Sequence, residues 1–220
     1  MWKSLIVVAT LTCSLLGLPA NAGDTDEGVA LYEQKKYSEA AGHLRAALAA
    51  DERDQRARYY LAQSLIELKQ YKEAEEVLRT AVEAPALEAL GEQAEPAEGM
   101  PSDAQLKIAL GRAEMGQEKF TEAREVLEAA KEMAPDNAEA YFRLGELELN
   151  RKDYPAAVKE LDRAVELEPG NAYAHYYAGI AYSNLKRPDK MIDHFQHFLK
   201  LAPDAPEAAK VQSLMRSLRR

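Results

Sequence analysis

Residues 138–171 read AEAYFRLGELELNRKDYPAAVKELDRAVELEPGN, and this stretch decides the fold. It carries two segments whose apolar residues recur every three or four positions, which is the spacing of an amphipathic helix. The stretch closes on Pro169. Two short helices within so short a stretch predict a helical hairpin.

The neighbouring segments copy this hairpin at a fixed distance. A shift by the length of the stretch superimposes two sets of residues, namely Pro135, Pro169 and Pro203, and Gly111, Gly145 and Gly179. Self-similarity at a period of this length is typical of a solenoid, in which each hairpin buries its apolar surface against the next one. The sequence therefore predicts an array of stacked hairpins.

The repeated residues resemble the tetratricopeptide repeat (TPR) family. In the reference stretch, Glu148 stands where that family places a tyrosine, and seven residues match its pattern: Tyr141, Leu144, Gly145, Ala157, Leu161, Ala164 and Pro169. The resemblance implies an all-α, right-handed α-solenoid of about five TPR helical hairpins plus a C-terminal capping helix. It also implies that small residues let the paired helices approach closely.

The register divides the chain into five parts. Residues 1–22 precede the repeats, residues 23–88 hold repeats one and two, and residues 104–205 hold repeats three to five. Residues 89–103 have no helical period and contain Pro96, Gly99 and Pro101, so they are an insertion loop, a hinge or a flap over the groove. Residues 206–220 form one amphipathic helix, which we expect to cover the last repeat. In the fifth repeat, Met191 and Phe198 replace small residues, so we expect bulkier or looser packing there.

Composition and charge narrow the class of partner. The chain is 47% hydrophobic with a formal net charge of −9, so most of its surface repels nucleic acid and anionic lipid. The charge is uneven, because residues 186–220 hold eight Lys or Arg against four Asp or Glu, whereas residues 23–185 hold nineteen against thirty-three. We therefore expect a protein partner and no nucleic acid.

Residues 1–22 have the layout of a secretory signal peptide. Lys3 precedes an apolar run from Leu5 to Leu18, and Pro19 is followed by Ala-Asn-Ala, which predicts cleavage after Ala22. The surroundings of Cys13 argue against a lipoprotein. The sequence predicts an exported protein without a membrane span once the signal is removed. A bacterial periplasm is the expected location, and full secretion is the alternative.

No constellation of catalytic residues is evident in the sequence. His194 and His197 lie three residues apart on one predicted helix, with Asp193 and His175 as neighbours that could help to hold a metal. Because no third ligand is fixed beside them, we interpret both histidines as surface imidazoles. A glycine-rich phosphate loop and a Gly-x-Ser-x-Gly motif are absent. We expect no enzyme activity, no metal and no cofactor.

The resemblance places ligand contacts on the first helix of each hairpin, at its second, fifth, ninth and twelfth places. Packing between neighbouring hairpins is the alternative for Tyr59 and Phe142. The expected partner-binding residues are Arg56, Tyr59, Gln63, Ile66, Ile108, Arg112, Phe142, Glu146, Leu149, Tyr173, Tyr176 and Ile180, with Gln105, Met115, Glu139 and Ser183 at the remaining places. Because this row is rich in apolar and aromatic side chains, it indicates exposed interface anchors.

Two functions remain open at this point. The first is a non-catalytic adaptor or scaffold of the cell envelope that binds an extended or helical, partly apolar segment in its concave groove. The second is a structural subunit that self-associates or is built into a multiprotein envelope complex. A clamp for a partner's terminal carboxylate, which some TPR proteins have, is not supported, because its places hold Thr25, Val29, Tyr60, Gln105 and Ala109.

Overall fold

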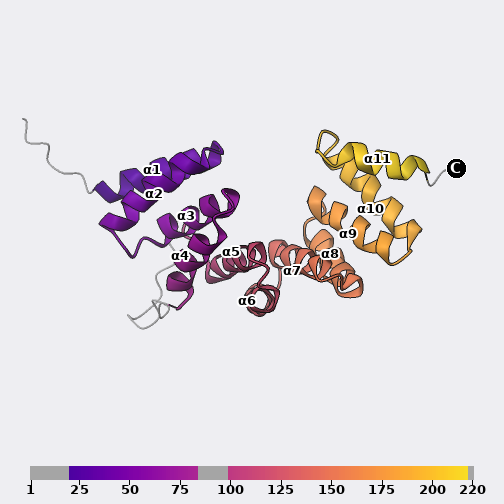
Figure 1. The fold of residues 1–220 in the computed structure, drawn as a ribbon, viewed down its shortest axis with the longest axis horizontal. Coiled ribbons are helices and arrows are strands. Elements are labelled where there is room, and N and C mark those ends of the chain that lie inside the picture. The colour runs from indigo at the N-terminus through magenta and orange to yellow at the C-terminus, as the bar shows by residue number, and fades with distance from the viewer. Residues whose placement is uncertain (1–19, 84–98, 218–220) are drawn as a thin grey trace, which may run out of the picture.

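The computed structural model describes residues 20–83 and 99–217, which form eleven α-helices and no strand (Figure 1). The first five helices are α1 (Ala20–Glu33), α2 (Tyr37–Ala50), α3 (Gln55–Glu67), α4 (Tyr71–Glu83) and α5 (Asp103–Gly116). The remaining six are α6 (Phe120–Met133), α7 (Ala138–Asn150), α8 (Tyr154–Leu167), α9 (Ala172–Asn184), α10 (Pro188–Leu201) and α11 (Ala208–Ser217). The all-α fold that the sequence predicts is confirmed.

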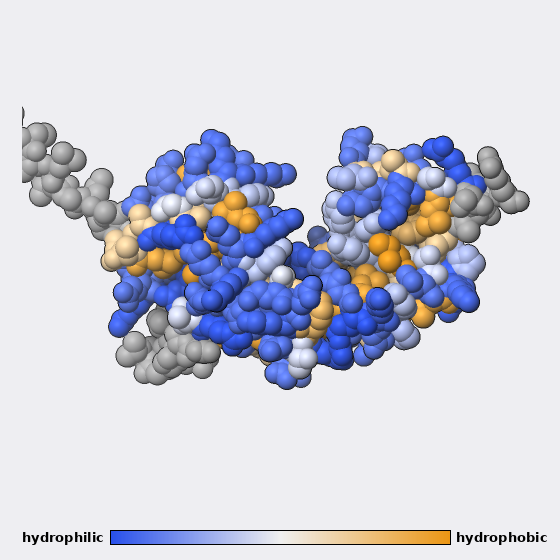
Figure 2. Space-filling model, in the orientation of Figure 1, coloured by the Kyte–Doolittle hydropathy of each residue, from blue (hydrophilic) through white to orange (hydrophobic). Residues whose placement is uncertain are grey.

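Consecutive helices pair into five hairpins, from α1–α2 to α9–α10, and each hairpin packs only on its neighbours in the chain. The first helices α1, α3, α5, α7 and α9 also contact one another in succession, whereas no two second helices make such contacts within the described residues. The first helices therefore lie closer together than the second helices, which curves the array around them. Figure 1 shows the resulting arc, and Figure 2 shows the surface hollowed between its two arms. We call the surface of the first helices inside this arc the inner face.

Every hairpin turns at a residue with a positive φ angle. These residues have φ angles of 55° to 62° and recur in the repeat register: Lys35, Lys69, Glu118, Lys152 and Lys186. At the fourth turn, the Asp153 N–H donates to the Glu148 carbonyl at 2.9 Å and the Lys152 N–H donates to the Leu149 carbonyl at 2.9 Å. This pair of hydrogen bonds is the Schellman motif, which satisfies the last carbonyls of the first helix. Glycine is the usual residue at this position because it has no Cβ.

Replacing Lys152 by glycine is expected to stabilise the protein by about 0.5 to 1 kcal/mol. A non-glycine residue in this conformation costs about 1 to 2 kcal/mol, and the greater freedom of glycine in the unfolded chain offsets part of the gain. Lys159→Gly is the matched control, because Lys159 is exposed within α8, where glycine costs about 1 kcal/mol. Urea unfolding of both variants measures the difference. Equal destabilisation by the two substitutions would contradict the strain at Lys152.

Within a hairpin, glycine on the first helix faces a large side chain on the second. A Cβ built on Gly145 would lie 2.4 Å from Leu161 Cγ, and one on Gly179 would lie 2.5 Å from Phe195 Cε1. Gly28 and Gly111 meet leucines in the same way, at 2.5 and 2.6 Å. The predicted role of small residues in close helix approach is therefore what the structure shows. The second hairpin has Ala62 at this position, and its Cβ is accommodated there.

The fifth hairpin packs differently, as the sequence predicts. Phe198 of α10 is fully buried and forms a cluster with Met191 of the same helix and with Ala208 and Val211 of α11. The outcome is bulkier packing, not looser packing, because Phe198 fills the space between α10 and α11.

Helix α11 continues the repeat register at the places of a first helix. In the second to fifth hairpins the seventh, eighth and eleventh places of the first helix are buried, such as Leu144, Gly145 and Glu148 in α7. In α11 these places hold Gln212, Ser213 and Arg216, all of which are exposed. Polar residues at places that are buried in the other first helices are the pattern of a solvating cap.

Two predictions fall largely outside the described residues. The signal peptide covers residues 1–22, of which only 20–22 are described, as the start of α1. The predicted insertion covers residues 89–103, of which 99–103 are described. Ser102 caps α5 by accepting from the Gln105 N–H at 3.2 Å, while the Gln105 side chain accepts from the Ser102 N–H at 2.8 Å. Asp103 is therefore the first residue of α5.

Candidate protein-binding face

The twelve predicted partner-binding residues lie on the first helices α3, α5, α7 and α9, but they differ in accessibility. Gln63, Ile66, Ile108 and Phe142 are buried, and Tyr173 is exposed, with 39% of its surface accessible. The others are half-buried: Arg56, Tyr59, Arg112, Glu146, Leu149, Tyr176 and Ile180.

Three apolar members of this row are core residues. Ile66, Ile108 and Phe142 retain only 7%, 5% and 5% of their accessible surface, and each packs in an apolar cluster between neighbouring hairpins. The expectation that they are exposed anchors is therefore wrong, and for Phe142 the alternative of packing between hairpins holds. The physical reason is that the first helices contact one another, so part of the side that turns toward the groove is covered by the next hairpin.

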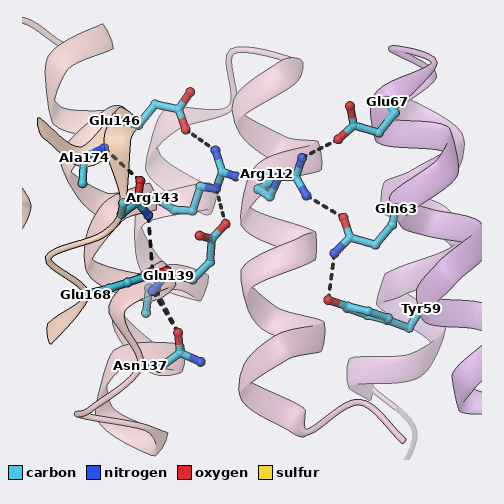
Figure 3. A network of polar contacts seen from close by, with 12 residues as sticks. Tyr59, Gln63, Glu67, Arg112, Asn137, Glu139, Arg143, Glu146, Glu168 and Ala174 are labelled. Atoms are coloured by element: carbon cyan, nitrogen blue, oxygen red, sulfur yellow. Dashed lines mark hydrogen bonds and ion pairs between the residues drawn. The ribbon is translucent and has the colours of Figure 1, made fainter. Parts of the chain in front are cut away.

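Around α3 and α5, the inner face is organised by a chain of hydrogen bonds (Figure 3). The Gln63 amide donates to the Tyr59 hydroxyl at 2.8 Å, and Arg112 donates to the Gln63 carbonyl oxygen at 2.5 Å. Arg112 also forms an ion pair with Glu67 at 2.9 Å. The Arg112 guanidinium on α5 thus binds the side chains of Gln63 and Glu67 on α3, which holds the second and third hairpins in a defined orientation.

A second arginine network lies on α7 (Figure 3). Arg143 binds Glu139 and Glu146, each at 2.7 Å, and its guanidinium lies 4.7 Å from the centre of the Phe142 ring. Burial alone would lower the pKa of Arg143, but the two carboxylates outweigh it and raise that pKa. Because Arg56 likewise pairs with Asp26 at 2.6 Å, each arginine among the predicted contacts, and Arg143 beside them, already has a carboxylate partner.

Aromatic rings dominate the C-terminal arm of the inner face. The ring of Tyr177 lies 5.7 Å from Phe142 and 5.4 Å from Tyr176, and Tyr173 lies 6.3 Å from Tyr176 in an edge-on arrangement. Burial, with Glu146 as the next contributor, raises the pKa of Tyr177 to about 12. The Tyr173 hydroxyl donates to Glu207, which directly precedes α11, at 3.3 Å. This arm combines partly exposed aromatic surface with a carboxylate.

Sequence reasoning missed three residues of this face. Tyr32 packs its ring 5.5 Å from Tyr60, Tyr177 joins the aromatic arm, and Glu207 lies at its end. Tyr32 occupies the twelfth place of the first repeat and Glu207 the second place of the register continued into α11, so the same spacing would have found both. Tyr177 occupies a sixth place, which the resemblance does not assign to ligand contact.

A buried carboxylate lies at the junction of the second and third hairpins. Glu114 of α5 is 0% exposed; one oxygen accepts from Arg79 of α4 at 2.8 Å, and the other has no hydrogen-bond partner among the described residues. Burial raises the pKa of Glu114 to about 7, against the attraction of Arg79. Nearby Glu75 behaves oppositely: burial would raise its pKa, but hydrogen bonds from Lys119, Gln117 and Arg79 lower it to about 2.

Glu114 makes the stability of the fold depend on pH. An acid whose pKa is higher in the folded state stabilises that state fully below its unfolded pKa of 4.5, and the contribution is lost as the pH rises through about 7. Between about pH 5 and pH 8 we expect a loss of roughly 2 kcal/mol from this group, since one pKa unit corresponds to about 1.4 kcal/mol. Glu114→Gln should flatten this slope, whereas Glu132→Gln, at an exposed site on α6, should leave it unchanged. Thermal unfolding at both pH values measures it, and an unaltered slope in Glu114→Gln would refute the assignment.

The histidines form a cluster in the last hairpin, and the interpretation of both as surface imidazoles is wrong for His194. His194 is buried with its Nδ1 atom 3.2 Å from Nδ1 of His175, while its Nε2 atom lies 3.4 Å from Asp162. His197 is exposed and stacks on the His175 ring at 4.9 Å. Within residues 20–83 and 99–217, no three His, Cys, Asp or Glu side chains are placed to hold a metal ion.

His175 acts on stability in the opposite direction to Glu114. Burial lowers the pKa of His175, against the carbonyl of Pro169, and the neighbouring His194 and His197 lower it further. The contribution of neutral His175 is therefore full above its ordinary pKa of 6.5 and is lost as the pH falls. Acid is expected to loosen the α9–α10 hairpin.

None of the helices in the described part of the chain is long and apolar enough to cross a bilayer.

A search of curated protein sequences found no match to the chain. Solved structures of similar fold include TTC0263, a thermophilic TPR protein of Thermus thermophilus, with 20% identity, a TM-score of 0.67 and coverage of 89% of this chain and 98% of that one. MamA matches with 19% identity and a TM-score of 0.60, covering 87% and 94%. YrrB, titled a TPR protein with an unusual peptide-binding site, matches with 22% identity and a TM-score of 0.58, covering 88% and 92%.

Family models provide the decisive comparison. Two models, each described as tetratricopeptide repeat, match residues 31–91 and, in overlapping stretches, 108–172 and 152–206. These ranges cover most of the chain and overlap all five helical hairpins of the structure. The chain belongs to the tetratricopeptide repeat family.

Proposed function

We propose that this protein is a non-catalytic adaptor whose inner face binds a segment of another protein. One observation carries the proposal: the first helices contact one another along a curved array and present half-buried and exposed side chains, among them Tyr59, Tyr173 and Tyr176, to the inside of the arc. Such side chains remove much apolar area from water while losing little rotamer freedom. The peptide-binding site named for YrrB, a protein of the same fold, supports this reading.

The bound segment is expected to be extended or helical and partly apolar. The arginines of the inner face are occupied by Asp26, Glu67, Glu139 and Glu146, so an acidic segment would have to displace an existing ion pair to reach one. An apolar segment could contact the uncharged side chains of Tyr59, Leu149, Tyr176 and Ile180 without displacing an ion pair. Binding of this kind requires no cofactor.

Photo-crosslinking in the source cells tests the proposal. A benzophenone amino acid at Tyr176, on the inner face, should give a covalent adduct with a discrete partner. The same amino acid at Glu132, exposed on the second helix α6, should not give that adduct. Adducts formed only from position 132 would overturn the assignment of the inner face.

The proposed place of action is the cell envelope, after export. The signal-peptide layout of residues 1–22 supports this proposal. N-terminal sequencing of the protein isolated from fractionated cells should find Gly23 as the first residue in the envelope or periplasmic fraction. An intact N-terminus in the cytoplasmic fraction would contradict export.

The uneven charge favours a second candidate, a self-associating structural subunit. Residues 186–220 carry a net positive charge and residues 23–185 a net negative one, so copies could attract one another end to end. Light scattering during size-exclusion chromatography distinguishes the candidates. An adaptor remains a monomer at every concentration, whereas a self-associating subunit gains mass as concentration rises and ionic strength falls.

A further inference from the structure

The carboxylate of Glu207 has no cationic partner in the described part of the chain. In the repeat register it corresponds to Glu139, which pairs with Arg143 four residues later at 2.7 Å. Four residues after Glu207 the chain has Val211, which is buried. Lys210 lies one residue nearer but forms no ion pair with Glu207 within residues 20–83 and 99–217. Among the described residues, the Glu207 side chain accepts a hydrogen bond from the Tyr173 hydroxyl at 3.3 Å.

The helix dipole explains why this charge is tolerated but does not neutralise it. Glu207 directly precedes α11, and its carbonyl accepts the Val211 N–H at 3.0 Å. A carboxylate at a helix N-terminus is stabilised by the aligned peptide dipoles. The negative charge remains available to a cation.

Aromatic rings surround the same place. The ring centres of Tyr173 and Tyr176 lie 6.3 Å apart in an edge-on arrangement. Both rings pack on Phe198, with centre-to-centre distances of 6.1 and 5.0 Å, which holds them in place. Burial, and after it the Glu207 carboxylate, raises the pKa of Tyr173 and of Tyr176. Tyr173 is 39% exposed, so part of its ring is open to a ligand.

The protein contains an internal example of what such a combination binds. On α7, the guanidinium of Arg143 lies over the Phe142 ring at 4.7 Å and pairs with the carboxylates of Glu139 and Glu146. A cation, an aromatic ring and acidic groups thus form one unit in the fourth repeat. In the fifth repeat Tyr176 occupies the place of Phe142, Tyr177 occupies the place of Arg143, and Glu207 supplies the carboxylate. The ring and the acid are present there, and the described part of the chain contributes no cation.

We propose that Tyr173, Tyr176 and Glu207 receive a lysine or arginine side chain of the bound protein segment. The cation would pair with the Glu207 carboxylate and lie against the tyrosine rings, which attract it through their quadrupoles. This inference rests on the proposed function, because it assigns one side chain of the segment that the inner face binds. It places a basic residue of the segment at the α9–α11 end of the inner face.

Panning a phage library of random twelve-residue peptides against the purified chain tests this assignment. Recovered peptides should share a lysine or arginine at one position. Synthetic peptides of these sequences should bind about five- to tenfold more weakly to Glu207→Gln and to Tyr173→Ala. Replacing the shared basic residue of the peptide by glutamine should cost wild type the same factor and should cost the Glu207→Gln variant little, because the two changes remove one interaction.

Glu132→Gln is the matched control, since it removes one exposed carboxylate on α6. Its affinity should equal that of the wild type, and circular dichroism should show unchanged helix content in every variant. Peptides that bind the inner face without a shared basic residue, or that bind Glu207→Gln as tightly as wild type, would overturn this inference and leave the proposed function standing. Recovery of no inner-face peptide would count against both.

Discussion

Replacing Gly145 by valine is expected to destabilise the protein by about 3 kcal/mol, because the space for a side chain there is already occupied. A Cβ at this position would lie 2.4 Å from Cγ and 2.8 Å from Cδ2 of Leu161, which is fully buried and cannot swing into solvent. Adding carbon atoms to a well-packed core costs about 1 to 3 kcal/mol or more. Urea unfolding followed by circular dichroism measures the change.

Two companion variants separate packing from helix propensity. Gly42→Val changes a glycine in α2 whose Cβ would meet no atom within 4 Å, so its stability should stay within about 0.5 kcal/mol of wild type. Gly145→Ala should be far milder than Gly145→Val, because the second repeat already accommodates Ala62 at this place. Equal effects of valine at positions 145 and 42 would refute the role of close helix approach.

Replacing Phe198 by alanine is expected to cost about 3 to 5 kcal/mol, the range for a buried aromatic residue truncated to alanine. Phe198 is 0% exposed and contacts the rings of Tyr173 and Tyr176 while packing in the cluster that contains Val211 of α11. Its loss leaves a cavity where α11 joins the array. Hydrogen exchange should therefore accelerate first in α10 and α11.

The first hairpins provide the comparison for this variant. The other four repeats have Ala47, Ala81, Ala130 and Ala164 at the same place, and all four alanines are buried. Amide exchange in α5 to α8 should be little altered in Phe198→Ala, since each hairpin contacts only its neighbours. Uniform acceleration along the whole chain would show that the array unfolds as one unit and would contradict this local account.

The fixed period of the repeats made the fold predictable from the sequence, since Gly145 and Leu161 occur at places that only a close-packed hairpin explains. The sequence left burial and exposure of Phe142 as alternatives, because the same side of the helix forms both the inner face and the contact with the next hairpin. The contact between His175 and His194 depends on the relative rotation of α9 and α10, which spacing along each helix does not determine. Glu207 lies beyond the last complete repeat, so the spacing finds it only when the register is continued into α11, which packs against α10.

The polar last helix has a consequence for how long such a protein can be. Because α11 follows the same register as every other first helix, the chain could be lengthened by genetic duplication of residues 138–171 in tandem, leaving the junction of Phe198 with α11 untouched. Each added module would bring its own interface energy, as in other linear arrays. Evolution or a protein engineer can thus lengthen the inner face by whole repeats, without redesigning α1 or α11.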